Sequence, residues 1–169
     1  MCGMNNREAT FSVIGAFIAT LLASFMSYTI LEEDHVPMIL ASTGASAMLI
    51  FALPHSPVSQ PWNLVGGHIT SAFVGISCLL LIDSPLLASS VAIAVAMVLM
   101  HVLRCMHPPG GATAVTAAIG SQQIENLGYA FMVVPVFLNA IILLSIAMAV
   151  GVLREKNPFY QDTTHHPDF

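Results

Sequence analysis

The sequence predicts an all-α fold, a polytopic transmembrane helix bundle of five to six spans that include a short or broken helix after the motif His107-Pro108-Pro109. Two observations predict this class. Hydrophobic residues make up 56 % of the chain and charged residues only 8 %, whereas roughly 25 % of the residues of an average globular protein are charged. The charges are also confined to a few short segments, and long uncharged runs lie between them, as expected of a chain that crosses a membrane repeatedly.

Five uncharged runs are long enough to cross a hydrocarbon core of about 30 Å, because a helix rises about 1.5 Å per residue. They are residues 11–31, 36–53, 64–82, 85–103 and 127–153. The last run contains Pro135 and Asn139, so we expect a long span that is tilted or kinked. Residues 110–124 form a shorter and more polar segment, which either crosses the membrane or re-enters and leaves on the same side.

The basic residues favour a crossing for this short segment, because cytoplasmic flanks are enriched in Lys and Arg. With the N-terminus inside and six crossings, the inner side holds Arg7, Arg104, Arg154 and Lys156, and the outer side holds Glu32, Glu33, Asp34, Asp83 and Glu125. Five spans plus a re-entrant element is the alternative.

The expected domain organisation is a single transmembrane domain at residues 11–153 between two cytoplasmic tails, residues 1–10 and 154–169. We expect a multi-pass protein of the cell inner membrane, with both termini in the cytoplasm.

Small residues recur at every fourth position in three of the runs. The rows are Gly15, Ala19 and Ala23, then Gly67, Ser71 and Gly75, and then Ala88, Ala92 and Ala96. Such rows let helices approach closely in lipid, so they predict a tight bundle. Because the chain is small, we also expect a homo-oligomer, with a dimer as the first guess.

The densest polar group at membrane depth surrounds the His-Pro-Pro motif, and polar residues inside a bilayer are the default site candidates. Prolines suit the start of a helix, so the backbone N–H groups after them are expected to be free, and a helix N-terminus suits an anion. Side-chain donors just before and after the prolines complete this first group. Its members are Arg104, His107, Gly110, Gly111, Ala112 and Thr113.

A second polar group lies in the second run and the loop that follows it. Hydroxyls beside a glycine within a span are typical of a discontinuous helix at a transport site, although helix packing by small residues explains them equally well. Asn63 is expected to cap the third helix and His68 to lie in its first turns. The members of this group are Ser42, Thr43, Gly44, Ser46, Asn63 and His68.

The sign of the charges favours an anion as the ligand. No Asp or Glu lies within any predicted span, and carboxylates are the usual groups that bind or relay cations there. Four histidines, His55, His68, His101 and His107, suggest coupling to protons or, as a rival, a membrane-embedded metalloprotein, while each is also explained as a packing histidine.

Other function classes find no support in the sequence. No basic patch exists to bind nucleic acid. The cysteines Cys2, Cys78 and Cys105 are scattered and are expected to be free thiols. We therefore expect no cofactor, no metal and no catalysis.

Two motifs resemble the HPP family of small integral membrane proteins, which is named for the motif that stands here as His107-Pro108-Pro109. They are GASAMLIFALPHSPVSQPWNLVGGH at residues 44–68 and MHPPGGATAV at residues 106–115. The resemblance implies four membrane spans. Characterised members are nitrite transporters of cyanobacteria and plastids, so the resemblance also implies nitrite movement, whereas the residues alone indicate only a small monovalent anion.

The expected function is thus transport of a small monovalent anion, with nitrite as the first candidate, after desolvation at the broken helix. An anion channel of the same specificity is the alternative, besides the metalloprotein. On this hypothesis Arg104→Gln weakens anion binding while the protein still folds and inserts.

Overall fold

The computed structural model describes residues 6–30 and 36–153, with side chains from residue 39 onward in the second range, and shows an all-helical bundle, as predicted. The long helices are α1 (Asn6–Ile30), α2 (Val36–Ala52), α3 (Pro61–Leu81), α4 (Pro85–Val102) and α7 (Leu138–Leu153). Shorter ones are α5 (Gly110–Ile119), α6 (Gln122–Leu127), η1 (Pro57–Ser59), η2 (Gly128–Met132) and η3 (Val133–Phe137).

Four helical stretches among the described residues are long and apolar enough to cross a membrane, the number that the family resemblance implies. They are Asn6–Ile30, Pro61–Leu81, Pro85–Val102 and Gln122–Leu153. Two shorter apolar helices, Ile39–Ala52 and Gly110–Ile119, accompany them. The predicted run at residues 36–53 therefore forms the shorter α2, at 17 residues.

Helix starts follow the prolines and polar residues of the sequence. Pro61 and Pro85 lie in the first turns of α3 and α4, where a missing N–H leaves no bond unmade. Helix α1 begins at Asn6, so the predicted tail of residues 1–10 is helical in its second half. Asn63 does not cap α3 as predicted, because the helix begins earlier and its N-cap residue is Gln60.

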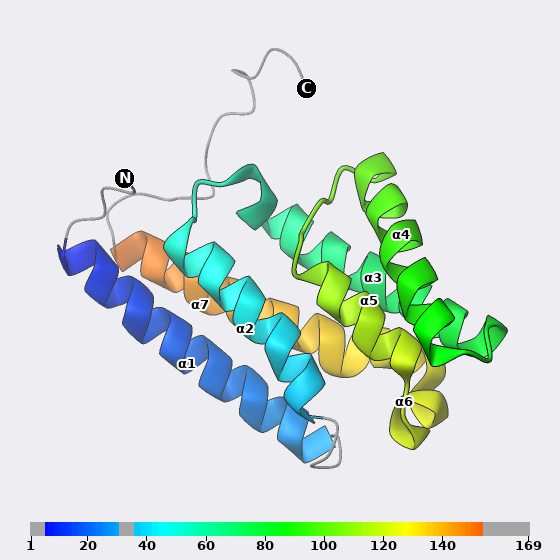
Figure 1. The fold of residues 1–169 in the computed structure, drawn as a ribbon. Coiled ribbons are helices and arrows are strands. Elements are labelled where there is room, and N and C mark those ends of the chain that lie inside the picture. Colours follow the sequence, from blue (N-terminus) through cyan, green and yellow to red (C-terminus); the bar gives the residue numbers. More distant parts are fainter. Residues whose placement is uncertain (1–5, 31–35, 154–169) are drawn as a thin grey trace.

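The predicted kink in the last span is confirmed. Val134, directly before Pro135, has non-helical φ and ψ of −128° and 112°, since the residue before a proline is biased toward extended backbone. The kink separates η2 from α7 and sets the direction in which α7 enters the bundle (Figure 1).

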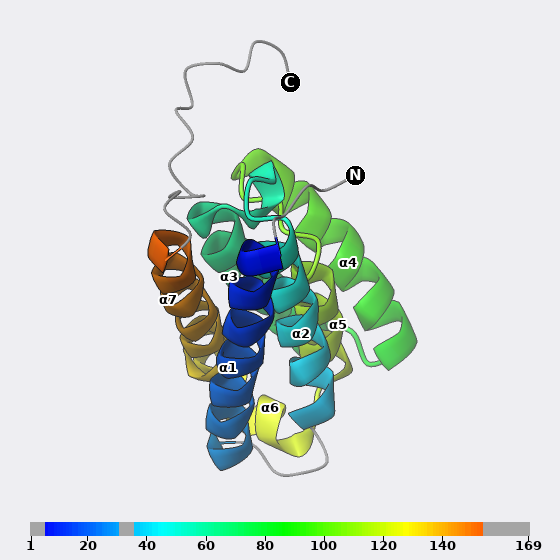
Figure 2. The same ribbon diagram turned by 90° about the vertical axis from the view of Figure 1, so that its left-hand side faces the viewer.

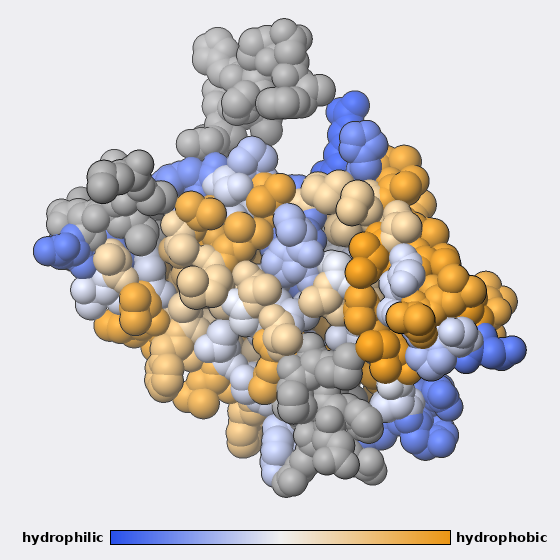
Figure 3. All heavy atoms as spheres, viewed as in Figure 1, coloured by the Kyte–Doolittle hydropathy of each residue, from blue (hydrophilic) through white to orange (hydrophobic). Residues whose placement is uncertain are grey.

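The helices form two groups that pack along the length of the bundle (Figures 1 and 2). Helix α1 packs against α2 and α7, while α3, α4 and α5 pack against one another. Contacts of α2 with α5 and of α3 with α7 join the groups. Large apolar side chains such as Phe17, Phe25 and Val98 face outward, and Figure 3 shows that one side of the molecule is largely hydrophobic. Such a surface suits the lipid core of a membrane.

The short segment after the His-Pro-Pro motif runs through the bundle. Residues 103–109 return from the end of α4 into the interior, and α5 continues from there to the end of the bundle where α6 lies (Figures 1 and 2). With ten residues, α5 spans only about half of a hydrocarbon core, and the connection and α5 together run from one end of the bundle to the other. A broken crossing, which the sequence favours over a re-entrant element, stays a prediction.

The predicted charge asymmetry is visible where the structure describes the chain. Arg7 and Arg104 belong to elements at one end of the bundle, whereas Asp83 and Glu125 belong to elements at the other (Figures 1 and 2). The remaining residues used in the orientation argument, Glu32, Glu33, Asp34, Arg154 and Lys156, lie outside the described residues.

The rows of small residues pack within the chain. All members of the three rows are buried. At Gly75 a Cβ atom would lie 2.5 Å from the Cβ of Ala117 and 2.6 Å from the backbone oxygen of Ala114, so α3 and α5 approach as closely as glycine permits. The predicted tight bundle is confirmed, and the homo-oligomer stays a prediction.

The broken crossing predicts that Arg104 and Glu125 face opposite sides of the membrane. In a variant without native cysteines, Arg104→Cys and Glu125→Cys should react with a membrane-impermeant maleimide added to opposite sides of sealed vesicles, because both side chains are exposed. Asp83→Cys should label with Glu125→Cys and serves as the control. Labelling of Arg104→Cys and Glu125→Cys from one side would restore the re-entrant alternative.

Candidate functional site

Five buried polar side chains meet where α2, α3, α5 and the connection at residues 103–109 come together. We call Ser42, Ser46, His68, His107 and Thr113 the buried polar cluster. Each is at most 6 % exposed. All five were predicted site residues, although they come from three helices and one connection that are far apart in the sequence.

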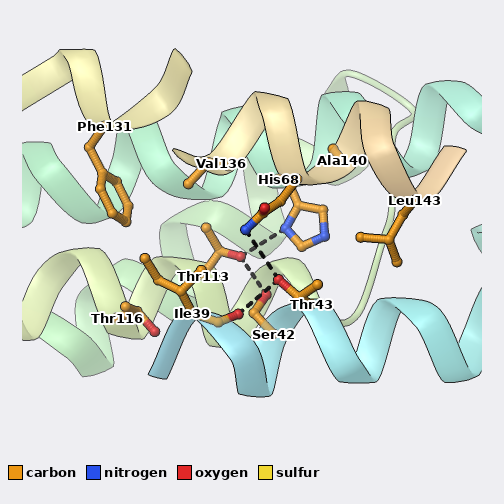
Figure 4. Close-up of a pocket in the computed structure, with 11 residues that line it drawn as sticks. Ile39, Ser42, Thr43, His68, Thr113, Thr116, Phe131, Val136, Ala140 and Leu143 are labelled. Carbon is orange, nitrogen blue, oxygen red and sulfur yellow. Dashed lines mark hydrogen bonds between the residues drawn. The ribbon is translucent and has the colours of Figure 1, made fainter. Parts of the chain in front are cut away.

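The cluster forms one continuous chain of hydrogen bonds. Ser46 Oγ lies between the two rings, 2.8 Å from His68 Nε2 and 3.0 Å from His107 Nε2. The other nitrogen of His68, Nδ1, lies 2.8 Å from Thr113 Oγ1, which in turn lies 2.6 Å from Ser42 Oγ. Figure 4 shows His68, Thr113 and Ser42 turned toward one another.

Backbone carbonyls close both ends of this chain. His107 Nδ1 donates to the oxygen of Val58 at 2.8 Å, and Ser42 Oγ donates to the oxygen of Pro109 at 3.0 Å. Because a carbonyl can only accept, a hydrogen bond at either end takes its proton from His107 Nδ1 or from Ser42 Oγ. Every member of the cluster thus has at least two polar neighbours, as buried polar groups in a membrane protein require.

Contacts from α3 hold His107 in place. Trp62 Nε1 donates to the oxygen of Leu103 at 3.2 Å, and Asn63 Nδ2 donates to the oxygen of Met106 at 2.8 Å, so the start of α3 secures the connection. At Gly67 a Cβ atom would lie 2.5 Å from the Cβ of His107. Only glycine at this position lets the connection lie directly on α3.

A small cavity borders the cluster. Its volume is about 20 Å³, enough for one water molecule. The polar part of its wall comes from Ser42, Thr43, His68, Thr113, Thr116 and Asn139, and the apolar part from Ile39, Phe131, Val136, Ala140 and Leu143 (Figure 4). The cavity therefore joins the cluster to the kinked last helix.

Asn139 contributes a buried acceptor without a partner. Its Nδ2 donates to Ser27 Oγ at 2.8 Å and to Thr43 Oγ1 at 3.5 Å, whereas its Oδ1 has no hydrogen-bond partner among the described residues. Thr43 donates its own proton to the oxygen of Ile39, so it can only accept from Asn139, which supports this orientation of the amide. An unpaired buried oxygen is costly, and a ligand or water that donates to it would remove that cost.

Asn139 was missed as a site residue. The sequence analysis used it only as a mark of an irregular span. The available signal was an amide in an otherwise apolar run four residues after Pro135, where the kink turns α7 toward the centre.

The backbone N–H groups at the N-terminus of α5, which were predicted to be free, already donate to carbonyl oxygens of the same chain. The N–H groups of Gly110, Gly111 and Ala112 donate to the oxygens of His107, Pro108 and Pro109 at 2.8, 3.0 and 3.1 Å. The carbonyl oxygens of the three residues just before α5 thus accept from its first three N–H groups. The prediction of free N–H groups for an anion is therefore wrong.

Three further candidates lie away from the cluster. Arg104 is exposed, has a φ of 53° at the turn after α4, and does not line the cavity. Gly44 lies within an uninterrupted α2, so the predicted break in the second span is absent. Asn63 serves the connection through its bond to Met106. Thr43 does line the cavity, as a site residue should.

The four histidines of the metalloprotein alternative do not come together as one group. His68 and His107 pair, with ring centroids 5.0 Å apart, but His55 and His101 are exposed elsewhere. No group of three His, Cys, Asp or Glu within reach of one metal ion occurs in residues 6–30 and 36–153. Cys78 and Cys105 are buried free thiols, as expected, and Cys2 lies outside the described residues.

Comparison with known proteins supports the resemblance seen in the motifs. The family model for the HPP transmembrane region matches residues 2–159. Two transmembrane proteins of Dictyostelium discoideum are 34 % and 30 % identical to this chain over 90 % of its length. The chain spans 50 % and 55 % of those two relatives, about half of their length. No solved structure gives a significant match.

The contact at Gly67 predicts a sharp difference between two glycine variants. Gly67→Ala should destabilise the protein by about 1–3 kcal/mol, because the added methyl group meets the Cβ of His107 and the backbone of Cys105. Gly111→Ala should leave stability unchanged or slightly raised, because nothing lies within 4 Å of its Cβ position and alanine favours helix. Thermal unfolding in detergent measures both. Equal losses in the two variants would contradict the close contact.

Proposed function

The chain belongs to the HPP family of transmembrane proteins, and from that premise we propose that it carries a small monovalent anion, with nitrite as the first candidate, across a membrane through the cavity beside the buried polar cluster. The observation that carries the proposal is the cluster itself. Five hydrogen-bonding side chains are buried at the centre of a membrane bundle next to a cavity. A purely structural core would be cheaper to build from apolar side chains.

The chemistry of the cavity wall supports an anion over a metal cation. Its polar groups are hydroxyls, one amide and one imidazole, and no carboxylate lines it among the described residues. Intramembrane cation sites usually rely on carboxylates or rings of carbonyls. Imidazole and hydroxyl groups can replace the water around a small anion when they hold a proton that is free to donate.

The size of the cavity indicates how a transport cycle would proceed. A volume of about 20 Å³ holds one water molecule, so a triatomic anion has to displace that water and move the wall. The kinked segment before α7 supplies Phe131 and Val136 to the wall. A shift of this segment against α2 and α5 would enlarge the cavity and change the side from which it opens.

The same proposal includes an orientation and an assembly state. The basic end of the bundle, with Arg7 and Arg104, faces the cytoplasm of a cell whose inner membrane holds the protein. We further expect a homodimer that uses the outer faces of α2 and α5. An open apolar groove there is lined by small residues such as Ala45 and Ala112, which allow close approach of helices in lipid.

Uptake into proteoliposomes tests the proposal directly. Vesicles that contain only this protein should take up nitrite faster than empty vesicles, and faster than they take up chloride. Formate and nitrate, as anions of similar size, define the selectivity. Nitrite uptake no faster than in empty vesicles would rule out the proposed function.

Single substitutions then test the place of the site. Ser46→Ala should lower nitrite uptake at least tenfold, because it removes the hydroxyl that joins His68 to His107. Ser90→Ala is the matched control on the exposed face of α4, and its uptake should not change. Arg104→Gln should also leave uptake unchanged, in contrast to the sequence-based prediction. A large loss in Arg104→Gln with none in Ser46→Ala would return the site to the helix end.

A further inference from the structure

The buried polar cluster contains fewer protons than it has contacts. The chain from the oxygen of Val58 to the oxygen of Pro109 consists of six polar contacts, each of 2.6 to 3.0 Å. Three hydroxyls and two neutral imidazoles supply one proton each, which makes five. With both rings neutral, one contact therefore lacks a proton.

The position of the gap follows from the end at Val58. His107 must hold its proton on Nδ1, so its Nε2 accepts from Ser46. Ser46 then accepts from His68 Nε2, and His68 Nδ1 accepts from the hydroxyl of Thr113. Each step uses the only proton that the donor has.

At the other end of the chain, Ser42 has one proton for two acceptors, the oxygen of Pro109 at 3.0 Å and Thr113 Oγ1 at 2.6 Å. The missing proton is therefore at one of the two contacts of Ser42. Ser42 and Thr113 both line the cavity (Figure 4).

The rest of the wall is also short of protons. The hydroxyls of Thr43 and Thr116 donate to the oxygens of Ile39 and Ala112, and Asn139 Oδ1 is an acceptor for which the described part of the chain supplies no donor. A bare anion in this cavity would face oxygen atoms that offer lone pairs. The cavity as it stands suits a species that brings a proton with it.

We propose that the site binds one anion together with one proton, and that the His68–Ser46–His107 unit holds this proton. The inference rests on the proposed function, because the anion is the one that the protein carries. With a second proton on His68, Nδ1 donates to Thr113, and the hydroxyl of Thr113 becomes free to donate to the anion. One added proton thus supplies one donor in the cavity, which the anion accepts, and balances the charge of the anion.

The surroundings leave the two histidines as the groups that respond to pH. The elements packed around them, α2, α5, α7 and the connection at residues 103–109, bring Ser46, Thr113, Asn139 and Cys105 to this region, and Cys105 Sγ lies 3.9 Å from Thr70 Oγ1. No carboxylate or basic side chain contacts the cluster among the described residues.

Titration calorimetry of nitrite binding to the purified full chain in detergent counts the protons. Measured at one pH in two buffers of different ionisation enthalpy, the heats should show uptake of close to one proton per nitrite bound. Affinity should also fall about tenfold per pH unit once the pH is above the pKa of the free site, because binding then requires a proton from solution. Nitrite that binds with no proton uptake and a pH-independent affinity would overturn the coupling but leave the proposed function intact.

Two histidine variants localise the proton. His68→Gln keeps a polar side chain but cannot titrate, so it should bind nitrite more weakly and lose the proton uptake. His101→Gln, on the exposed face of α4, should behave as the unmodified chain. Proton uptake that persists in His68→Gln would overturn the assignment of the proton to His68. Absence of any nitrite binding to the unmodified chain would overturn both the coupling and the proposed function.

Discussion

The hydrogen bonds that Ser46 makes to two histidines are the interaction on which the interior of this bundle depends. A buried polar group in a membrane protein cannot form a hydrogen bond with bulk water, so it needs a hydrogen-bond partner inside the protein. Ser46 Oγ satisfies His68 on α3 and His107 on the connection at once, from a position on α2. Three segments are thereby held in one relative arrangement, and a change in any of them would leave a polar atom unpaired.

Close packing makes this arrangement possible. The connection with His107 lies directly on Gly67, and α5 lies directly on Gly75. The connection can therefore return into the bundle, where His107 is completely buried. An unbroken helix in this place would bury apolar side chains and would leave no room for the chain of hydrogen bonds.

The same features connect the fold to the proposed transport. The cluster borders a cavity whose remaining wall comes from the segment around Pro135 and from α7. Its protons are one short of its contacts, and Asn139 offers another acceptor. A ligand that arrives with a proton would bring one of the donors that the site lacks, so proton and anion would stabilise each other in the site. This coupling follows from proton counting and does not require a fixed charge in the membrane.

The sequence by itself determined the helical membrane class, the approximate limits of the long helices and the depth of most polar residues, because these depend on hydrophobic runs, prolines and charges that are local in the chain. It also identified all five residues of the cluster. Only the tertiary structure decided that these five meet, that Asn139 joins them, and that Arg104 and the N–H groups of Gly110 and Gly111 do not. Contacts such as that of Ser42 with Thr113 join residues that are far apart in the chain. They depend on the rotation and spacing of packed helices, which no local pattern specifies.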